Sequence, residues 1–297
     1  MKKQTILLSL LALAIAVTVG CGTSTTGAPT FTKVAFLSNR TVTPPTVLFT
    51  ANLDGTNVTP IPFSTTSVRN LSSSADGKTV AFIANTGTGN GIWVEKADGS
   101  GQLQMPGVSN PDFVRISPDG KKLTYNDNSG HISVINIDGT GNLDLTPTLP
   151  ANMVYCFEPS FSADSSLIAF TCGAKVSGSG IYTIKADGSG IKTVEVRASG
   201  FYADYAFLTP DGKKVIFIGN LGANGNAVIS VNIDGTGETL LVPNAGELVI
   251  LNSNLYYDDP CASTVLVFKA NLDGTKPVLV NDSSNNADLY YVNSGGC

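Results

Sequence analysis

Short apolar segments separated by turn-forming residues run along most of the chain, a pattern typical of β-strands joined by tight turns. One phrase recurs six times: an apolar strand, then a turn that contains Asp-Gly, then Ser or Thr. Repeat units of this length suit about four short strands each, which is the size of a propeller blade. The aspartates of these turns are 39 to 49 residues apart, and they are Asp54, Asp98, Asp138, Asp187, Asp234 and Asp273.

A second phrase precedes four of these turns and reads Ser-Pro-Asp-Gly-Lys or a close variant. It predicts a hairpin, because Asp-Gly accepts the positive φ of a tight reversal and Gly does so without strain. Each copy is followed by a strand with an aromatic residue six positions past the Asp, which we expect to pack one blade against its neighbour. The copies lie at 74–78, 117–121, 162–166 and 209–213, and the aromatic residues are Phe82, Tyr125, Phe170 and Phe217.

These phrases resemble the repeats of the TolB-type, WD-repeat-like β-propeller family, most closely at 117–125 and 181–188. The resemblance covers nearly all of residues 33–292. It implies an all-β fold, a six-bladed β-propeller of four-stranded antiparallel blades over residues 33–297. It says little about function, since the same blades serve receptors, periplasmic scaffolds and enzyme domains.

The two ends of the repeat region suggest how the ring closes. The first unit begins at Val34, already at the second strand of the pattern, and a spare strand, 288–292, follows the sixth unit. We expect this C-terminal strand to supply the missing inner strand of the first blade, which would remove an open sheet edge.

The first residues predict an export signal. Lys2 and Lys3 precede an apolar stretch over 6–19, and the sequence Thr-Val-Gly-Cys at 18–21 resembles a bacterial lipobox. We therefore expect a signal peptide over 1–20, acylation of Cys21 and a flexible tether over 21–32; the alternative is an ordinary secretory signal with an incidental Cys. The protein would then lie in the bacterial cell envelope. Its acyl anchor would attach it to the membrane, at the periplasmic face of the outer membrane or at the cell surface.

Four cysteines remain after Cys21, an even number in an oxidising compartment. Three pairings are possible. Cys156 and Cys172 flank a predicted hairpin and would lie nearly opposite each other, which leaves Cys261 with Cys297. A metal site is disfavoured because no Cys-x-x-Cys spacing occurs.

Composition and charge narrow the function further. Charged residues make up 14% of the chain and the net charge is −5, which argues against binding nucleic acid. A single His excludes metal or catalytic sites that need two imidazoles. Ten of the 23 acidic residues lie in the two turn phrases, so much of the negative charge is architectural. Calcium binding at these turns is disfavoured, because the position two before the Asp is Asn or Lys.

The best candidate binding residues lie at the start of the first strand of each unit. Seven positions before each hairpin Asp are Arg69, Asp112, Phe157 and Asp204, positions that converge at one mouth of a propeller channel. The simpler interpretation is that strand starts are polar because they face solvent. With their charged and aromatic neighbours, the predicted channel-mouth residues are Arg69, Asp112, Phe113, Glu158, Tyr202, Asp204, Tyr205 and Glu247.

We expect a non-catalytic, monomeric envelope protein without cofactor or metal, which binds an extracellular or envelope protein, peptide or glycan at a propeller face. The alternative is a propeller enzyme, of the polysaccharide lyase or quinone-dependent dehydrogenase type, acting on a small molecule or glycan. Such sites generally recruit several His or a metal cluster, whereas this chain has one His. A third hypothesis is a purely structural domain in an extracellular assembly.

Overall fold

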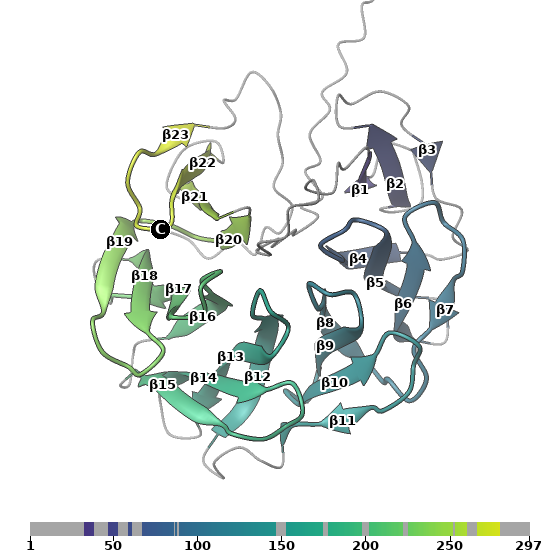
Figure 1. Cartoon of the computed structure of the whole chain (residues 1–297), viewed down its shortest axis with the longest axis horizontal. Helices are drawn as coiled ribbons and strands as arrows, with labels where there is room; N and C mark the ends of the chain where they lie inside the picture. Colours follow the sequence, from purple (N-terminus) through teal and green to yellow (C-terminus); the bar gives the residue numbers. More distant parts are fainter. Residues whose placement is uncertain are drawn as a thin grey trace, which may run out of the picture.

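A computed structural model describes residues 33–38, 47–52, 59–60, 67–85, 87, 89–146, 153–174, 178–197, 202–221, 225–251, 253–259 and 266–279. Over these residues the chain forms six antiparallel sheets, which lie around a common centre (Figure 1). The predicted signal peptide, the tether and Cys21 lie outside the described residues. Within the described part, no helix has the length and apolar character needed to cross a bilayer.

Five of the sheets are four-stranded blades, in which the strands follow one another in sequence order from the centre outward. Blade 1 contains β4 (Ser67–Ser73), β5 (Thr79–Asn85), β6 (Asn90–Lys96) and β7 (Leu103–Gln104). Blade 2 contains β8 (Pro111–Ile116), β9 (Lys122–Asp127), β10 (Ile132–Asn136) and β11 (Leu143–Asp144). Blade 3 contains β12 (Met153–Phe161), β13 (Leu167–Ala174), β14 (Ser179–Lys185) and β15 (Lys192–Val196). Blade 4 contains β16 (Ala203–Leu208), β17 (Lys214–Asn220), β18 (Asn226–Asn232) and β19 (Thr239–Pro243), and blade 5 contains β20 (Leu248–Leu251), β21 (Asn254–Asp259), β22 (Leu266–Asn271) and β23 (Val278–Leu279).

The first unit departs from this plan. Its sheet has three strands, β1 (Lys33–Ser38), β2 (Val47–Asn52) and β3 (Thr59–Pro60), so the prediction of six four-stranded blades is wrong: five are described. The reason is visible in the sequence, because the first unit begins at its second strand and lacks the hairpin phrase that would make an inner strand. The segment 288–292, which the sequence predicts to close the ring, lies outside the described residues.

The hairpin aspartates act as turn formers. In blade 1 the Ser74 hydroxyl donates to Asp76 Oδ1 at 2.7 Å, and the same oxygen accepts the Lys78 N–H at 3.1 Å. The equivalent bond from Thr209 to Asp211 in blade 4 is 2.6 Å long. Side-chain hydrogen bonding of this kind holds the pKa of Asp211 below its ordinary value, so these carboxylates are committed to the turns.

The outer Asp-Gly turns also contact the preceding blade. Gly235, in the turn after β18, has φ +84°, and a Cβ at this position would lie 2.6 Å from the carbonyl oxygen of Val194 in blade 3. A Cβ at Gly274 would meet the carbonyl oxygen of Leu241 in blade 4 at 2.7 Å. Glycine is therefore required at both positions for two reasons: the backbone has a positive φ, and the neighbouring blade leaves no room for a Cβ.

The repeated aromatic residues lie in the interfaces between blades. Phe217 is fully buried in a cluster that joins Ile181 and Val194 of blade 3 to Ile229 of blade 4. Phe170 occupies the matching cluster between blades 2 and 3 and stacks on Tyr182 with ring centroids 5.8 Å apart. Tyr125 lies in the corresponding cluster between blades 1 and 2, so these buried aromatic residues help to hold successive blades together.

The structure confirms the Cys156–Cys172 disulfide. These residues face each other across β12 and β13 with their Cα atoms 4.0 Å apart, and both are buried. The bond ties the inner strand of blade 3 to the next strand outward. Cys261 and Cys297 lie outside the described residues, so their pairing stays a prediction.

Candidate functional site

The inner strands of three blades carry a β-bulge at the same repeat position, six residues before the hairpin Asp. The strand register shifts between Arg69 and Ser72 in β4, and equivalent shifts occur in β12 and β16. The bulged residues Asn70, Glu158 and Tyr205 have φ values of 50°, 52° and 51°. Positive φ is uncommon for side chains of this size, and a bulge re-aims the residue that it contains.

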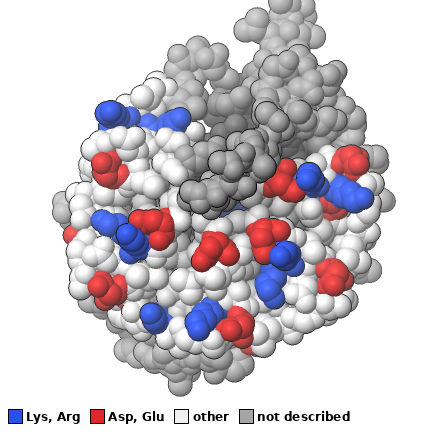
Figure 2. Space-filling model, in the orientation of Figure 1, with Lys and Arg blue, Asp and Glu red and all other residues white. Residues whose placement is uncertain are grey.

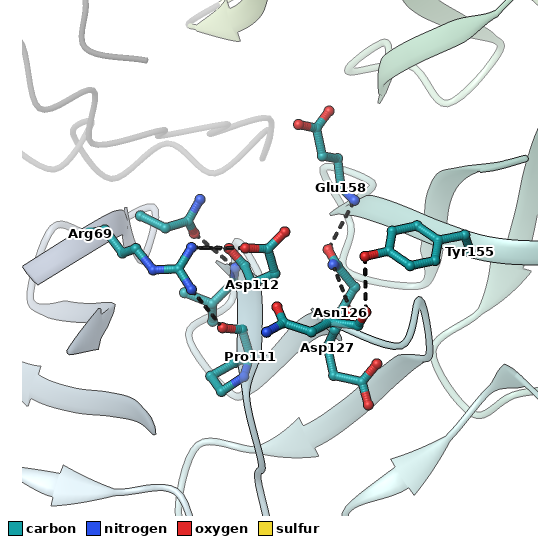
Figure 3. Close-up of polar contacts among 10 residues, drawn as sticks. Arg69, Pro111, Asp112, Asn126, Asp127, Tyr155 and Glu158 are labelled. Atoms are coloured by element: carbon teal, nitrogen blue, oxygen red, sulfur yellow. Dashed lines mark hydrogen bonds and ion pairs between the residues drawn. The ribbon is translucent and has the colours of Figure 1, made fainter. Parts of the chain in front are cut away.

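The re-aimed side chains connect neighbouring blades. Asn70 Oδ1 accepts the backbone N–H of Val114 in blade 2 at 2.8 Å, and Glu158 Oε2 accepts the N–H of Tyr205 in blade 4 at 3.1 Å. The backbone N–H of Glu158 itself donates to Asn126 Oδ1 in blade 2 at 3.1 Å (Figure 3). Part of the predicted site is therefore also part of the joint between blades.

Arg69 and Asp112 form an ion pair across blades 1 and 2, with Nη1 and Oδ1 2.8 Å apart (Figure 3). Arg69 Nη2 also donates to the carbonyl of Pro111 at 3.0 Å. The Asp112 side chain remains 51% exposed. These two predicted residues thus meet, and their opposite charges offset each other at the channel mouth.

Deeper in the channel, carboxyl groups from three blades lie close to one another. Burial raises the pKa of Glu158, and the neighbouring Asp204 carboxyl, which shares a hydrogen bond with it, raises it further. Burial also raises the pKa of Asp204. It raises the pKa of Glu247 to about 8, and the negative charge of Asp258 raises the Glu247 pKa further. These raised pKa values mean that the three carboxyl groups keep their protons to higher pH than free carboxyl groups do.

Asp258 and Arg115 belong to this group, and sequence reasoning missed both. Asp258, on β21, accepts the backbone N–H groups of Gly246 and Glu247 at 3.0 and 2.6 Å. Arg115 lies four positions before its hairpin Asp, where blades 1 and 3 have Ser72 and Ser160. A comparison of the repeats at this position would have shown Arg115 as the exception.

Arg115 lies on β8, the inner strand of blade 2. Its guanidinium lies over the ring of the predicted residue Phe113, 4.2 Å from the ring centroid. The charge interacts with Glu158 in blade 3 and with Tyr205 in blade 4, and a residue of blade 2 reaches blade 4 only across the centre of the ring. Burial lowers the pKa of Arg115 to about 10, which still leaves it charged at neutral pH.

Two tyrosines lie exposed near the channel mouth. The Tyr202 hydroxyl donates to Asn226 Oδ1 at 2.7 Å, and that of Tyr155 donates to the carbonyl of Asn128 at 2.9 Å. Their exposed fractions are 41% and 55%. His131, the single histidine, lies half-exposed in a turn with its Nδ1 3.4 Å from Asp127 Oδ2.

On the face that Figure 2 shows, acidic and basic side chains of the described residues are interspersed. The structure brings Glu158, Asp204, Tyr205 and Glu247 into one electrostatic group, while Tyr202 lies apart at the rim. Among the described residues, no three His, Cys, Asp or Glu side chains are arranged to hold a metal ion.

The family model of the TolB beta propeller domain matches residues 32–247. The chain belongs to this family. A solved structure with the same architecture is TolB from Acinetobacter baumannii, at 16% identity and a TM-score of 0.63, covering 82% of this chain and 61% of that one. No curated protein matches the chain.

Other solved structures share the fold in different settings. A chain of the nidogen/laminin complex aligns at 13% identity and a TM-score of 0.58, covering 80% of this chain and 91% of that one. The tricorn protease aligns at 12% identity and a TM-score of 0.61, covering 78% of this chain and 28% of that one. Because these identities are low, the likeness establishes the fold of this TolB-family propeller and nothing about its partners.

Proposed function

We propose that this protein is a non-catalytic, lipid-anchored propeller of the bacterial envelope or cell surface that binds a protein, peptide or glycan at its channel mouth. The observation that carries the proposal is the convergence of side chains from successive inner strands on one mouth of the ring. Asp112, Tyr155 and Tyr202 supply exposed polar and aromatic surface there. Tyrosines that combine a rigid ring with a hydroxyl are common anchors of binding surfaces.

Two further observations support recognition of a partner. The inner strands are held by hydrogen bonds between blades, such as Glu158 to Tyr205, which gives the mouth a preorganised shape. Among related folds, the nidogen/laminin complex contains a propeller within a protein complex. For this chain, a macromolecular partner is the corresponding proposal.

The hydrogen-bonded Glu158–Asp204 pair is the one feature that favours the alternative, a propeller enzyme with acid–base chemistry. Its geometry argues against a glycosidase, because the two catalytic carboxyls of those enzymes stand about 5 to 9.5 Å apart with the substrate between them. Turnover of polysaccharides or quinone-linked substrates by the purified protein, lost in Glu158→Gln, would favour the enzyme.

A triple variant tests the binding proposal. Asp112→Asn, Glu158→Gln and Asp204→Asn together remove three carboxyl groups at the mouth while keeping side-chain shape. The matched control, Asp187→Asn, Asp234→Asn and Asp273→Asn, removes three carboxyl groups at the outer turns. We expect partner capture from the native host to fall only in the mouth variant. Equal capture by the mouth variant and the unaltered protein would contradict the proposal.

A further inference from the structure

The three strands of the first sheet correspond to the second, third and fourth strands of a blade. In β1, as in the second strands β5, β9, β13 and β17, the repeated aromatic residue comes three positions after the first residue of the strand; in β1 it is Phe36. β1 and β2 both contact β4 of the next blade, as β5 and β6 both contact β8. Among the described residues the inner edge of β1 therefore has no partner strand, and such an edge offers backbone groups to a further strand.

The C-terminal residues repeat the sequence of an inner strand and its hairpin. Residues 287–296 read Ala-Asp-Leu-Tyr-Tyr-Val-Asn-Ser-Gly-Gly, and residues 203–212 of blade 4 read Ala-Asp-Tyr-Ala-Phe-Leu-Thr-Pro-Asp-Gly. Asp288 takes the place of Asp204 in this alignment. Val292 takes the place of the buried apolar residue that ends β16. The segment thus has the pattern of an inner strand.

The C-terminal segment is also long enough to reach the inner edge of β1. Residues 105–110 and 197–202 lead from the outer strand of one blade to the inner strand of the next, and 280–286 offer one residue more after β23. The segment just before β1 is the competing candidate. Its residues 22–27 read Gly-Thr-Ser-Thr-Thr-Gly and have no large apolar side chain to bury against the neighbouring blades.

The complete blades give the register in which such a strand would pair with β1. In blade 3 Cys156 is the Cα partner of Cys172, and blades 1, 2 and 4 pair residues at the same two repeat positions. In the first unit these two positions are Ala287 and Ser38, the last residue of β1. A strand in this register places Ala287 opposite Ser38.

We propose that residues 287–293 form the sixth inner strand of the ring, antiparallel to β1, and that Asp288 is a further residue of the channel mouth. Residues at the repeat position of Asp288 meet across successive blades, since Arg69 Nη1 in blade 1 lies 2.8 Å from Asp112 Oδ1 in blade 2. Asp288, in the sheet before blade 1, approaches Arg69 from the other side. This inference rests on the proposed function, because it adds a residue to the same binding surface.

A pair of introduced cysteines tests the strand and its register in the full-length, exported protein. Ser38→Cys with Ala287→Cys should form a disulfide almost completely, because the same repeat positions carry the natural disulfide of blade 3. Mass spectrometry of unreduced peptides identifies the bond. Reduction should then lower the Tm more than it does in the unaltered protein. Ser38→Cys with Asp288→Cys is the control, since it shifts the register by one residue and should crosslink in only a minor fraction.

Hydrogen exchange gives a second test, which needs no substitution and covers the case in which the cysteine variants do not fold. A strand with partners on both sides has all its N–H groups bonded, whereas an edge strand leaves the N–H groups of alternate residues free. We expect the amides of residues 34–38 to be protected throughout in the unaltered protein. Alternate amides should exchange rapidly once residues 286–297 are deleted.

The place of Asp288 at the mouth is tested by binding. Asp288→Asn keeps the shape of the side chain and removes its charge, so capture of the partner from the native host should fall several-fold. Asp282→Asn removes a carboxyl group from the linker that precedes the proposed strand. This control should capture the partner as the unaltered protein does.

Four results would overturn the inference: equal crosslinking of residue 38 to residues 287 and 288, rapid exchange of alternate β1 amides in the unaltered protein, unchanged protection of β1 after the deletion, or full capture by Asp288→Asn. Failure of the proposed function looks different. If the triple variant of the mouth keeps its partner while the disulfide forms and β1 is protected, the binding proposal falls and the sixth strand stands. If the triple variant loses its partner while residue 287 does not crosslink, the binding proposal stands and the strand does not.

Discussion

Glu158 Oε2 in blade 3 accepts a hydrogen bond of 3.1 Å from the backbone N–H of Tyr205 in blade 4. Both residues sit at bulged positions with positive φ, and both face the channel. The same side chain thus joins two blades and lines the candidate site. Any substitution at the mouth has to be judged for its effect on the ring as well as on binding.

Glu158→Ala should lower the free energy of unfolding more than Glu158→Gln does. Ala leaves the Tyr205 N–H without its acceptor, at a cost of about 1 to 3 kcal/mol, whereas the Gln carbonyl can still accept. Urea denaturation measures both. Asp112→Ala, at a half-exposed position, is the control for loss of a carboxyl group and should cost less. Equal losses in Ala and Gln would show that the acceptor has no structural role.

Stability should fall as the pH rises from mildly acidic to alkaline. Glu247 has an ordinary pKa of 4.5, and burial raises it to about 8 in the folded protein. Because the folded state holds this proton more tightly, the stabilisation is complete below pH 4.5 and is lost as the pH rises to 8. Thermal unfolding should therefore give a lower Tm at pH 9 than at pH 6.

Glu247→Gln isolates the contribution of this residue from those of other buried carboxyls such as Glu95 and Glu195, whose pKa values burial raises to about 7. Gln cannot ionise, so the variant should lose less stability across the same pH range. A decline as steep as that of the unaltered protein would mean that Glu247 ionises without cost.

Two glycines of blade 4 separate the effect of backbone conformation from that of contact between blades. Gly212 has φ +67° with nothing within 4 Å of the place that a Cβ would occupy, whereas a Cβ at Gly235, φ +84°, would lie 2.6 Å from the carbonyl oxygen of Val194. Gly212→Ala should cost about 1 to 2 kcal/mol from the left-handed backbone alone. Gly235→Ala should cost distinctly more in the same urea titration, and equal costs would argue against the contact.

The lipid anchor is testable at one residue. Cells fed radiolabelled palmitate should label the unaltered protein and not Cys21→Ser, because acylation requires the Cys thiol. The variant should also leave the membrane fraction, since a chain with a net charge of −5 is not attracted to anionic lipids. Persistent labelling of Cys21→Ser would mean that another residue is acylated, and label absent from both proteins would favour an ordinary secretory signal.

The sequence predicted the repeat architecture because each blade depends on local signals: Asp-Gly turns, an aromatic residue at a fixed pleat position, and Cys156 opposite Cys172. Counting back from the hairpin Asp also located the starts of inner strands, since Asp112 and Asp204 are the second residues of β8 and β16. Prediction from the sequence failed where contacts between strands and blades determine the structure. The first sheet has three strands, Arg69 is neutralised by Asp112 from the next blade, and the bulge at Glu158 changes the alternation of the strand.

Arg115 and Asp258 escaped prediction for a similar reason. Neither lies at the strand start, and their importance comes from groups in other parts of the ring: Arg115 meets Glu158 and Tyr205, and Asp258 meets Glu247. The raised pKa values of the channel carboxyls likewise depend on burial by several blades, which the order of residues along one strand does not specify.

The central claim is that the channel mouth binds a partner, and site-specific photocrosslinking in the native host tests it most directly. A photoreactive amino acid placed at Asp112, which is 51% exposed at the mouth, should give a discrete covalent adduct. The same group at Leu240, which is 52% exposed on the outer strand β19, should not. Adducts from Leu240 and none from Asp112 would place the interaction on the outer rim and contradict the account.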